Sequence, residues 1–265
     1  MTKRSDLYRF LSLNIWGNLP SPIQRGVSKT YSSIYNKKLS KHFIQPYCKF
    51  NYDDPGYLSR FQPASGNEDY QSFQDFFTRT FREPLKISND PIWGCEGLLC
   101  ETGKVGTFDL VNVKGDKRHL RTIFGDVGHQ IPDHYHFHNI FLHNNNYHRI
   151  HAPVSGTIQR IERIKGDLVL LRPWVYRTDP SHPALRNERV NIDIIDQNGN
   201  TWYISIVGGP AVGTIELNDQ TIIGHNVESG SEIALFLLGS TCCIACPSPA
   251  RHTSLGNFVN VADPI

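Results

Sequence analysis

The sequence changes character near residue 91, and this change restricts the fold more than any other feature of the chain. From there on, Gly, Pro and Asn-Gly interrupt short runs rich in β-branched and aromatic residues, which is typical of strands joined by turns. Asn198-Gly199 lies between two such runs and indicates a tight hairpin. We therefore expect a compact, mainly antiparallel β domain over residues 86–265. The expected strands are 156–158, 167–171, 190–196, 202–207 and 233–238.

Residues 1–85 show helical periodicity instead. Apolar side chains recur at helical spacing and basic side chains fall largely between them. The apolar positions are Val27, Tyr31, Ile34, Tyr35, Leu39 and Phe43, and the basic ones are Arg25, Lys29, Lys37, Lys38 and Lys41. Such a helix either packs on the protein body or lies on an anionic membrane surface. A second helical segment is expected at Asp69–Leu85, ended by Pro84. The expected fold class is α+β, with an N-terminal helical segment before the β domain.

The charge balance and the apolar stretches exclude several classes of protein. The 265 residues carry a net charge of +2 and no arginine-rich run, so nothing indicates nucleic-acid binding. The longest uncharged apolar stretch, Ile233–Cys246, is shorter than the ~18 residues that a membrane-spanning helix needs. Leu7–Leu19 is apolar but lacks the cleavage site of a secretory signal. We expect a cytoplasmic protein that contacts membranes only peripherally.

The six cysteines are expected to be reduced thiols, because no signal peptide directs the chain to an oxidising compartment. Cys243-x-x-Cys246 is compatible with redox or metal chemistry, but no second such pair accompanies it. It lies in an apolar run that resembles a buried strand. We interpret these cysteines as small core residues.

Two distant segments carry the residues for nucleophilic catalysis. Tyr147–Pro153 contains His148 and His151, and Leu238–Thr241 places Ser240 directly after Gly239. A serine near an imidazole base can act as a nucleophile. Gly239 leaves the carbonyl before Ser240 without steric cover, so the hydroxyl can attack the backbone. Two histidines permit separate roles as base and as proton donor. The alternative is an ordinary strand serine and a pair of surface histidines.

A second group of histidines is compatible with metal binding. Alternation along a strand would place three imidazoles on one face, and the group consists of His134, His136, His138 and His143. No carboxylate follows at a familiar ligand spacing. We therefore predict a polar face on an edge strand and no metal site.

In combination, these motifs resemble the phosphatidylserine decarboxylase family. Residues 146–156 are similar to the signature of its β domain, and Leu238-Gly239-Ser240-Thr241 to its cleavage motif. Supporting segments, in the same order as in the family, are 76–79, 84–85, 186–190 and 207–213. The resemblance implies a proenzyme that cuts itself between Gly239 and Ser240. Ser240 then becomes a covalent pyruvoyl cofactor at the start of a short α chain, and the β chain ends at Gly239.

The resemblance also implies the roles of individual residues. His151, oriented by a carboxylate, would deprotonate Ser240, and His148 would protonate the carbanion left after loss of CO2. Glu96 stands where the family has the aspartate that supplies this carboxylate. Asn146 and Gly209 stand where the family usually has aspartate and alanine. These departures leave open a processing-defective protein of the same fold that acts only at lipid surfaces.

The function predicted from the resemblance is conversion of phosphatidylserine to phosphatidylethanolamine by a peripheral membrane enzyme. Its expected partners are the phospholipid substrate, the membrane surface and the two chains made by cleavage, and a homodimer is left open. The alternative is the same chemistry on a soluble amino acid, aromatic ones included.

Overall fold

The computed structural model describes the chain from residue 33 onward, apart from 88–90, 172, 210–213, 238 and 252. Before residue 33 it describes only 7, 10–15, 19, 23 and 26. Four positions of the predicted amphipathic helix, namely Arg25, Val27, Lys29 and Tyr31, lie outside the described residues, and so does Leu238 of the serine motif.

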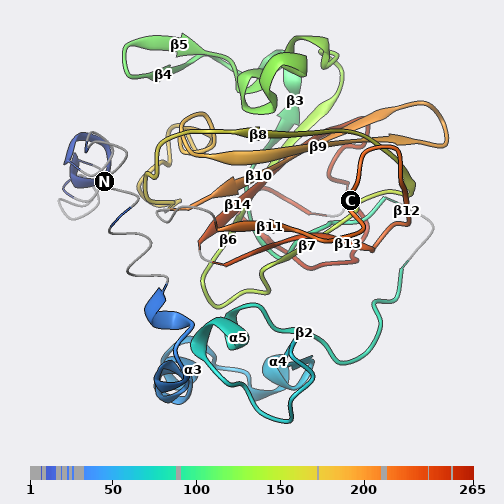
Figure 1. Cartoon of the computed structure of the whole chain (residues 1–265). Helices are drawn as coiled ribbons and strands as arrows, with labels where there is room; N and C mark the ends of the chain where they lie inside the picture. Colours follow the sequence, from blue (N-terminus) through green and yellow to red (C-terminus); the bar gives the residue numbers. More distant parts are fainter. Residues whose placement is uncertain are drawn as a thin grey trace.

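An eight-stranded antiparallel sheet forms the body of the protein (Figure 1). Its strand order is β12-β8-β9-β10-β14-β6-β3-β15. The strands are β3 (Gly97–Lys104), β6 (His136–Leu142), β8 (Gly156–Ile164), β9 (Arg189–Asp196), β10 (Thr201–Gly208), β12 (Asn226–Val227), β14 (Ser240–Cys246) and β15 (Phe258–Val259). The predicted hairpin at Asn198-Gly199 is confirmed: it joins β9 to β10, and Gly199 has a φ of 79°, which glycine adopts without strain.

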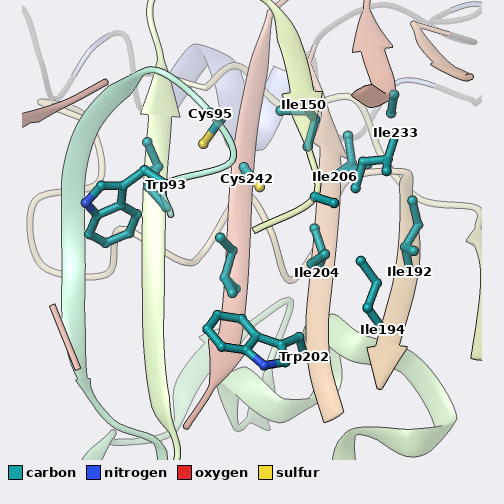
Figure 2. Close-up of a cluster of buried hydrophobic side chains, with 14 of the residues drawn as sticks. Trp93, Cys95, Ile150, Ile192, Ile194, Trp202, Ile204, Ile206, Ile233 and Cys242 are labelled. Carbon is teal, nitrogen blue, oxygen red and sulfur yellow. The ribbon is translucent and has the colours of Figure 1, made fainter. Parts of the chain in front are cut away.

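A three-stranded antiparallel sheet packs against one face of the large sheet. It consists of β7 (Arg149–His151), β11 (Ile215–Leu217) and β13 (Glu232–Phe236), with β13 in the middle. Apolar side chains from both sheets form the main core between them (Figure 2). Ile150 and Ile233 come from the small sheet, and Ile204, Ile206 and Cys242 from the large one. This packing confirms the mainly antiparallel β architecture.

The opposite face of the large sheet is covered by shorter elements and a second apolar cluster around Phe124, Phe137 and Tyr203. The covering elements are η4 (Val105–Thr107), η5 (Leu120–Gln130) and a hairpin of β4 (Val111–Val113) and β5 (Asp116–Arg118). The predicted strand at 167–171 is wrong. Asn187 donates to the Val169 carbonyl and accepts from the Val169 amide, so its side chain replaces the partners that a neighbouring strand would supply.

The described N-terminal helices are η1 (Leu11–Ile15), η3 (Lys38–Phe43), α3 (Ile44–Asn51), α4 (Pro55–Ser59) and α5 (Phe73–Phe77). The helices α3, α4 and α5 lie together on one side of the β sandwich, and the β4–β5 hairpin projects on the other side (Figure 1). The first described helix, η1, lies apart from them, and its Ser12 hydroxyl contacts the Leu170 amide and the Tyr176 hydroxyl. Aromatic residues of α5 pack against α3 through contacts such as Tyr47–Phe73, whose ring centroids are 5.1 Å apart.

The predicted helix at Asp69–Leu85 is much shorter in the structure. The Ser72 hydroxyl accepts from the Asp75 amide and caps the start of α5, and Thr78 leaves helical geometry at its end. The chain then forms β2 (Thr80–Phe81), which pairs with β1 (Phe61–Gln62). Pairing with a distant segment therefore ended the helix before Pro84.

Candidate active site

Ser240 is the first residue of β14, in the interior of the large sheet. Gly208 of β10 and Leu142 of β6 are its partners on the two sides. Its side chain has no exposed surface, and its hydroxyl has no hydrogen-bond partner among the described residues. A buried polar group without a partner costs on the order of 1–3 kcal/mol, so this arrangement is typical of a functional site.

The peptide bond before Ser240 is held in an unusual place. Gly239 has a φ of 40°, a conformation that L-residues with a Cβ rarely adopt. Its carbonyl lies against Gly209, where an added Cβ would be 2.6 Å from the Gly239 oxygen and 3.0 Å from the Gly239 carbon. The two glycines together allow the backbone at the predicted cleavage point to approach the end of β10 closely.

Hydrogen bonds attach the residues before Gly239 to three other parts of the chain. The Phe236 amide donates to the His148 carbonyl at 2.8 Å, and the Leu237 amide donates to the Thr214 carbonyl at 2.7 Å. From α5, Gln74 Nε2 donates to the Leu237 carbonyl at 2.9 Å. The small sheet thus brings His148 beside the segment that leads to Ser240, and α5 covers that segment.

His148 is fully buried and presents an unoccupied ring nitrogen. Its Nδ1 lies 2.8 Å from the Asn146 carbonyl, which can only accept, so Nδ1 carries the proton. Nε2 is therefore unprotonated, and it has no partner among the described residues. The Phe77 ring covers the imidazole at a centroid distance of 3.9 Å. Burial and then the charge of Arg79 lower the pKa of His148 to about 3, so the imidazole is neutral at physiological pH.

His151 differs because both of its ring nitrogens are engaged. Nδ1 donates to the Gly230 carbonyl at 2.7 Å, so Nε2 accepts from the Tyr147 hydroxyl at 2.9 Å. Burial lowers the pKa of His151, although the Gly230 carbonyl and Glu232 act in the opposite direction. This imidazole is a neutral base that already has a hydrogen-bond donor.

Glu96 is buried directly before β3 and binds the loop that carries the histidines. One carboxylate oxygen accepts from the Tyr57 hydroxyl and, at 3.1 Å, from the Tyr147 amide. The other lies 3.5 Å from Arg60 Nη2. Glu96 therefore contacts the backbone of the residue whose hydroxyl binds His151, and Tyr147 is the link between them.

The structure brings some of the predicted site residues into contact and leaves others apart. Glu96, Tyr147 and His151 form one connected group, and the His148 carbonyl binds close to the cleavage segment. Ser240 forms no hydrogen bond to either imidazole, because its hydroxyl has no partner among the described residues. Sequence reasoning assigned no role to Tyr57, Gln74 or Arg79. Arg79 belongs to the family-like segment 76–79. The signal that could have singled it out is an arginine two residues after an aromatic helix.

The predicted polar face on an edge strand is wrong, because β6 lies between β14 and β3 and His138 is buried. His138 lies on β6 with its two ring nitrogens 2.9 Å from the Thr102 hydroxyl and 3.0 Å from the Ser248 carbonyl. No group of three metal-binding side chains occurs among the residues that the structure describes. The interpretation of Cys243 and Cys246 as core residues is confirmed, since both are free and buried in β14.

Comparison with known proteins identifies the family. The family model described as phosphatidylserine decarboxylase matches residues 73–265. The chain belongs to this family. Curated phosphatidylserine decarboxylase proenzymes are similar over most of their length. The proenzyme of Delftia acidovorans is 28% identical over 217 residues, 73% of this chain and 74% of the relative. That of Psychrobacter arcticus is 27% identical over 230 residues, 80% of each chain.

The match to phosphatidylserine decarboxylases includes the candidate active site. It starts at Phe73, the first residue of α5, and therefore includes Glu96, both histidines and the Gly239–Ser240 bond. Tyr57 and Arg60 precede the matched range. Among the described residues of this decarboxylase, no helix combines the length and hydropathy needed to cross a bilayer.

Proposed function

We propose that this chain is a phosphatidylserine decarboxylase proenzyme that cleaves itself between Gly239 and Ser240 and then converts phosphatidylserine to phosphatidylethanolamine. The observation that supports it best is the Ser240 hydroxyl. It is buried without a described partner, directly after a glycine at positive φ, in a chain of the decarboxylase family.

The site suits a pyruvoyl group made from Ser240. The residue is the first of its strand, so a new chain end there leaves the ladder of β14 from Thr241 onward unchanged. The free Nε2 of His148 supplies a polar group for a reacting carbon. When present, such a group accepts electrons from a substrate amine as CO2 departs.

In the cleavage step, the Ser240 oxygen attacks the Gly239 carbonyl carbon. An ester forms as the peptide C–N bond breaks, and the amine takes up the proton that the hydroxyl gives up. Elimination then releases the Gly239 carboxylate, and water displaces the nitrogen as ammonia. Gly239 and Gly209 contribute by exposing the carbonyl and holding it in one position.

The two histidines receive separate roles, as the resemblance implies. We assign His151 as the base for Ser240, and its Nε2 must exchange the Tyr147 hydroxyl for the serine hydroxyl to act. Glu96 orients this base through Tyr147. His148 is assigned to protonate the substrate carbon after loss of CO2. Its resting Nε2 carries no proton, so it must first accept one from the substrate's ammonium group, and Asn146 and Phe77 hold the ring in place for both transfers.

The N-terminal helices would hold the enzyme on an anionic membrane surface. Leu39, Phe43 and Phe50 are 76%, 54% and 84% exposed, and they lie among the basic residues Lys37, Lys38, Lys41 and Lys49. Exposed apolar side chains flanked by basic ones bind headgroup regions of bilayers. The substrate's headgroup would then reach the site beneath α5.

Denaturing mass spectrometry together with a CO2-release assay tests the function. We expect two chains, the shorter beginning with pyruvoyl at position 240, and CO2 release from phosphatidylserine vesicles but not from L-serine or aromatic amino acids. Ser240→Ala should yield one intact, inactive chain. Ser205→Ala is the matched control, since Ser205 is also a buried serine without a described partner. An intact wild-type chain, or turnover of the soluble amino acids alone, contradicts the proposal.

A further inference from the structure

Arg79 is a buried guanidinium with no anionic partner in direct contact. Its side chain has no exposed surface, and it forms no ion pair with any described residue. The Phe61 and Phe76 rings lie 4.8 and 5.0 Å from its guanidinium carbon. Burying a charge without an opposite charge costs free energy. The hydrogen bonds of Arg79 must therefore offset this cost.

Those hydrogen bonds converge on the loop before His148. The Nη2 atom of Arg79 donates to the Asn145 and Asn146 carbonyls, both at 2.8 Å. The Asn146 carbonyl is also the acceptor for His148 Nδ1 at 2.8 Å. One oxygen therefore accepts from the guanidinium and from the imidazole, which a carbonyl with two lone pairs can do.

We propose that Arg79 is a positioning residue that keeps His148 neutral and in the Nδ1–H tautomer. This inference rests on the proposed function, in which the unprotonated Nε2 of His148 first accepts the substrate's proton and then delivers it to carbon. A hydrogen bond from a charged donor is stronger than one from a neutral donor and fixes the Asn146 carbonyl. The fixed carbonyl holds the proton on Nδ1 and leaves Nε2 free. The positive charge close by opposes a second proton on the ring.

The surroundings of His148 support this electrostatic role. Burial is the largest cause of the lowered pKa of His148, and the charge of Arg79 is the second. His143 lowers this pKa further. The other charged or titratable groups of the described site are His151, Tyr147, Glu96, and the Arg149–Glu232 pair that links β7 to β13. Glu96 is engaged with Tyr57, Tyr147 and Arg60, so Arg79 is the principal charge acting on the imidazole.

Nitrogen-15 NMR of the uncleaved Ser240→Ala protein tests the inference without requiring activity. The ring nitrogen shifts report the tautomer and the protonation midpoint of His148. In the Arg79→Gln background we expect the midpoint to rise by at least one pH unit and the Nε2–H tautomer to appear. In the matured enzyme, the acid limb of the kcat/KM profile should move to higher pH by a similar amount.

Arg189 provides the matched control. It too is a buried arginine bound to carbonyls, those of Ile123, Asn187 and Thr122, and it forms no ion pair with the described residues. Arg189→Gln should leave the His148 midpoint unchanged. If Arg79→Gln does not fold, Arg79→Met decides, since methionine is long and unbranched but has neither a positive charge nor an N–H donor for the two carbonyls. An unchanged His148 midpoint and tautomer in the folded Arg79 variant overturns the inference. This result is independent of whether phosphatidylserine is the substrate.

Discussion

Replacing Gly209 by alanine should slow self-cleavage, because the new methyl group meets the carbonyl that Ser240 attacks. The added Cβ would lie 2.6 Å from the Gly239 oxygen, and ordinary contacts begin near 3.4 Å, so this carbonyl must move by roughly 0.8 Å. A misplacement of about 1 Å costs on the order of a hundredfold in rate. That factor corresponds to about 2.7 kcal/mol of activation free energy.

The assay is a time course of cell-free synthesis, quenched in denaturant and resolved by intact mass. The fraction of cleaved chain gives the rate constant for each variant. Gly199→Ala is the control, because Gly199 has a φ of 79° and no neighbour within 4 Å of an added Cβ. It should lose about 1–2 kcal/mol of stability without slower cleavage. If Gly209→Ala folds and matures within threefold of the wild-type rate, the Gly239 carbonyl is not held at this position during attack.

The remaining predictions concern titration and proton transfer. His148 is neutral in the folded state with a pKa of about 3, so the unfolded chain binds its proton first as pH falls. Its contribution to the unfolding free energy should be complete above pH ~6.5 and decline by about 1.4 kcal/mol per pH unit towards pH ~3, and His148→Asn should flatten that part of a urea-unfolding series. Burial raises the pKa of Glu101 to about 7, so its contribution is present at acid pH and lost as pH rises through 7. Glu101→Gln should therefore stabilise the protein by about 3 kcal/mol at pH 8 and by little at pH 4, and equal effects at both would contradict a neutral buried carboxyl. Tyr147→Phe removes the donor to His151 Nε2 but keeps the stacked ring, 5.7 Å from the imidazole by centroid, through which Glu96 orients this base. Cleavage measured by intact mass should therefore be no slower, and a tenfold loss would mean that the hydroxyl relays the serine proton. His148→Ala should mature to two chains but release no CO2, and normal turnover would remove the role given to this imidazole.

Local patterns in the sequence predicted those parts of the fold that depend on local chemistry. The Asn198-Gly199 turn formed as expected because its residues suit the backbone of a hairpin wherever it occurs. The apolar run around Cys243 became a buried strand because nothing polar interrupts it. The segments at 69–85 and 167–171 were predicted wrongly. In both, a partner far away in the chain competes with the local preference, β1 in the first case and Asn187 in the second.

The same distinction between local and long-range signals holds for the candidate site. Ser240, His148 and His151 could be selected from the sequence, because each belongs to a short motif whose residue types suit the chemistry. The connections among them could not. The contact of Glu96 with Tyr147 spans 51 residues and forms when the β domain folds. The contact of Arg79 with the Asn146 carbonyl spans 67 residues and forms only when the N-terminal region docks on that domain. No periodic pattern in the sequence indicates these contacts.

The position of β14 determines what becomes of the molecule once it is cut. With the proposed cut before Ser240, this strand would begin the smaller fragment, and it lies between β10 and β6, hydrogen bonded to both. The far end of the fragment is also tied, since the Ile265 amide donates to the Pro91 carbonyl and the Trp93 amide to the Asp263 carbonyl. Scission at the proposed position would therefore convert one polypeptide into a heterodimer, in which the smaller subunit completes the larger one's sheet and is expected to leave only when both unfold.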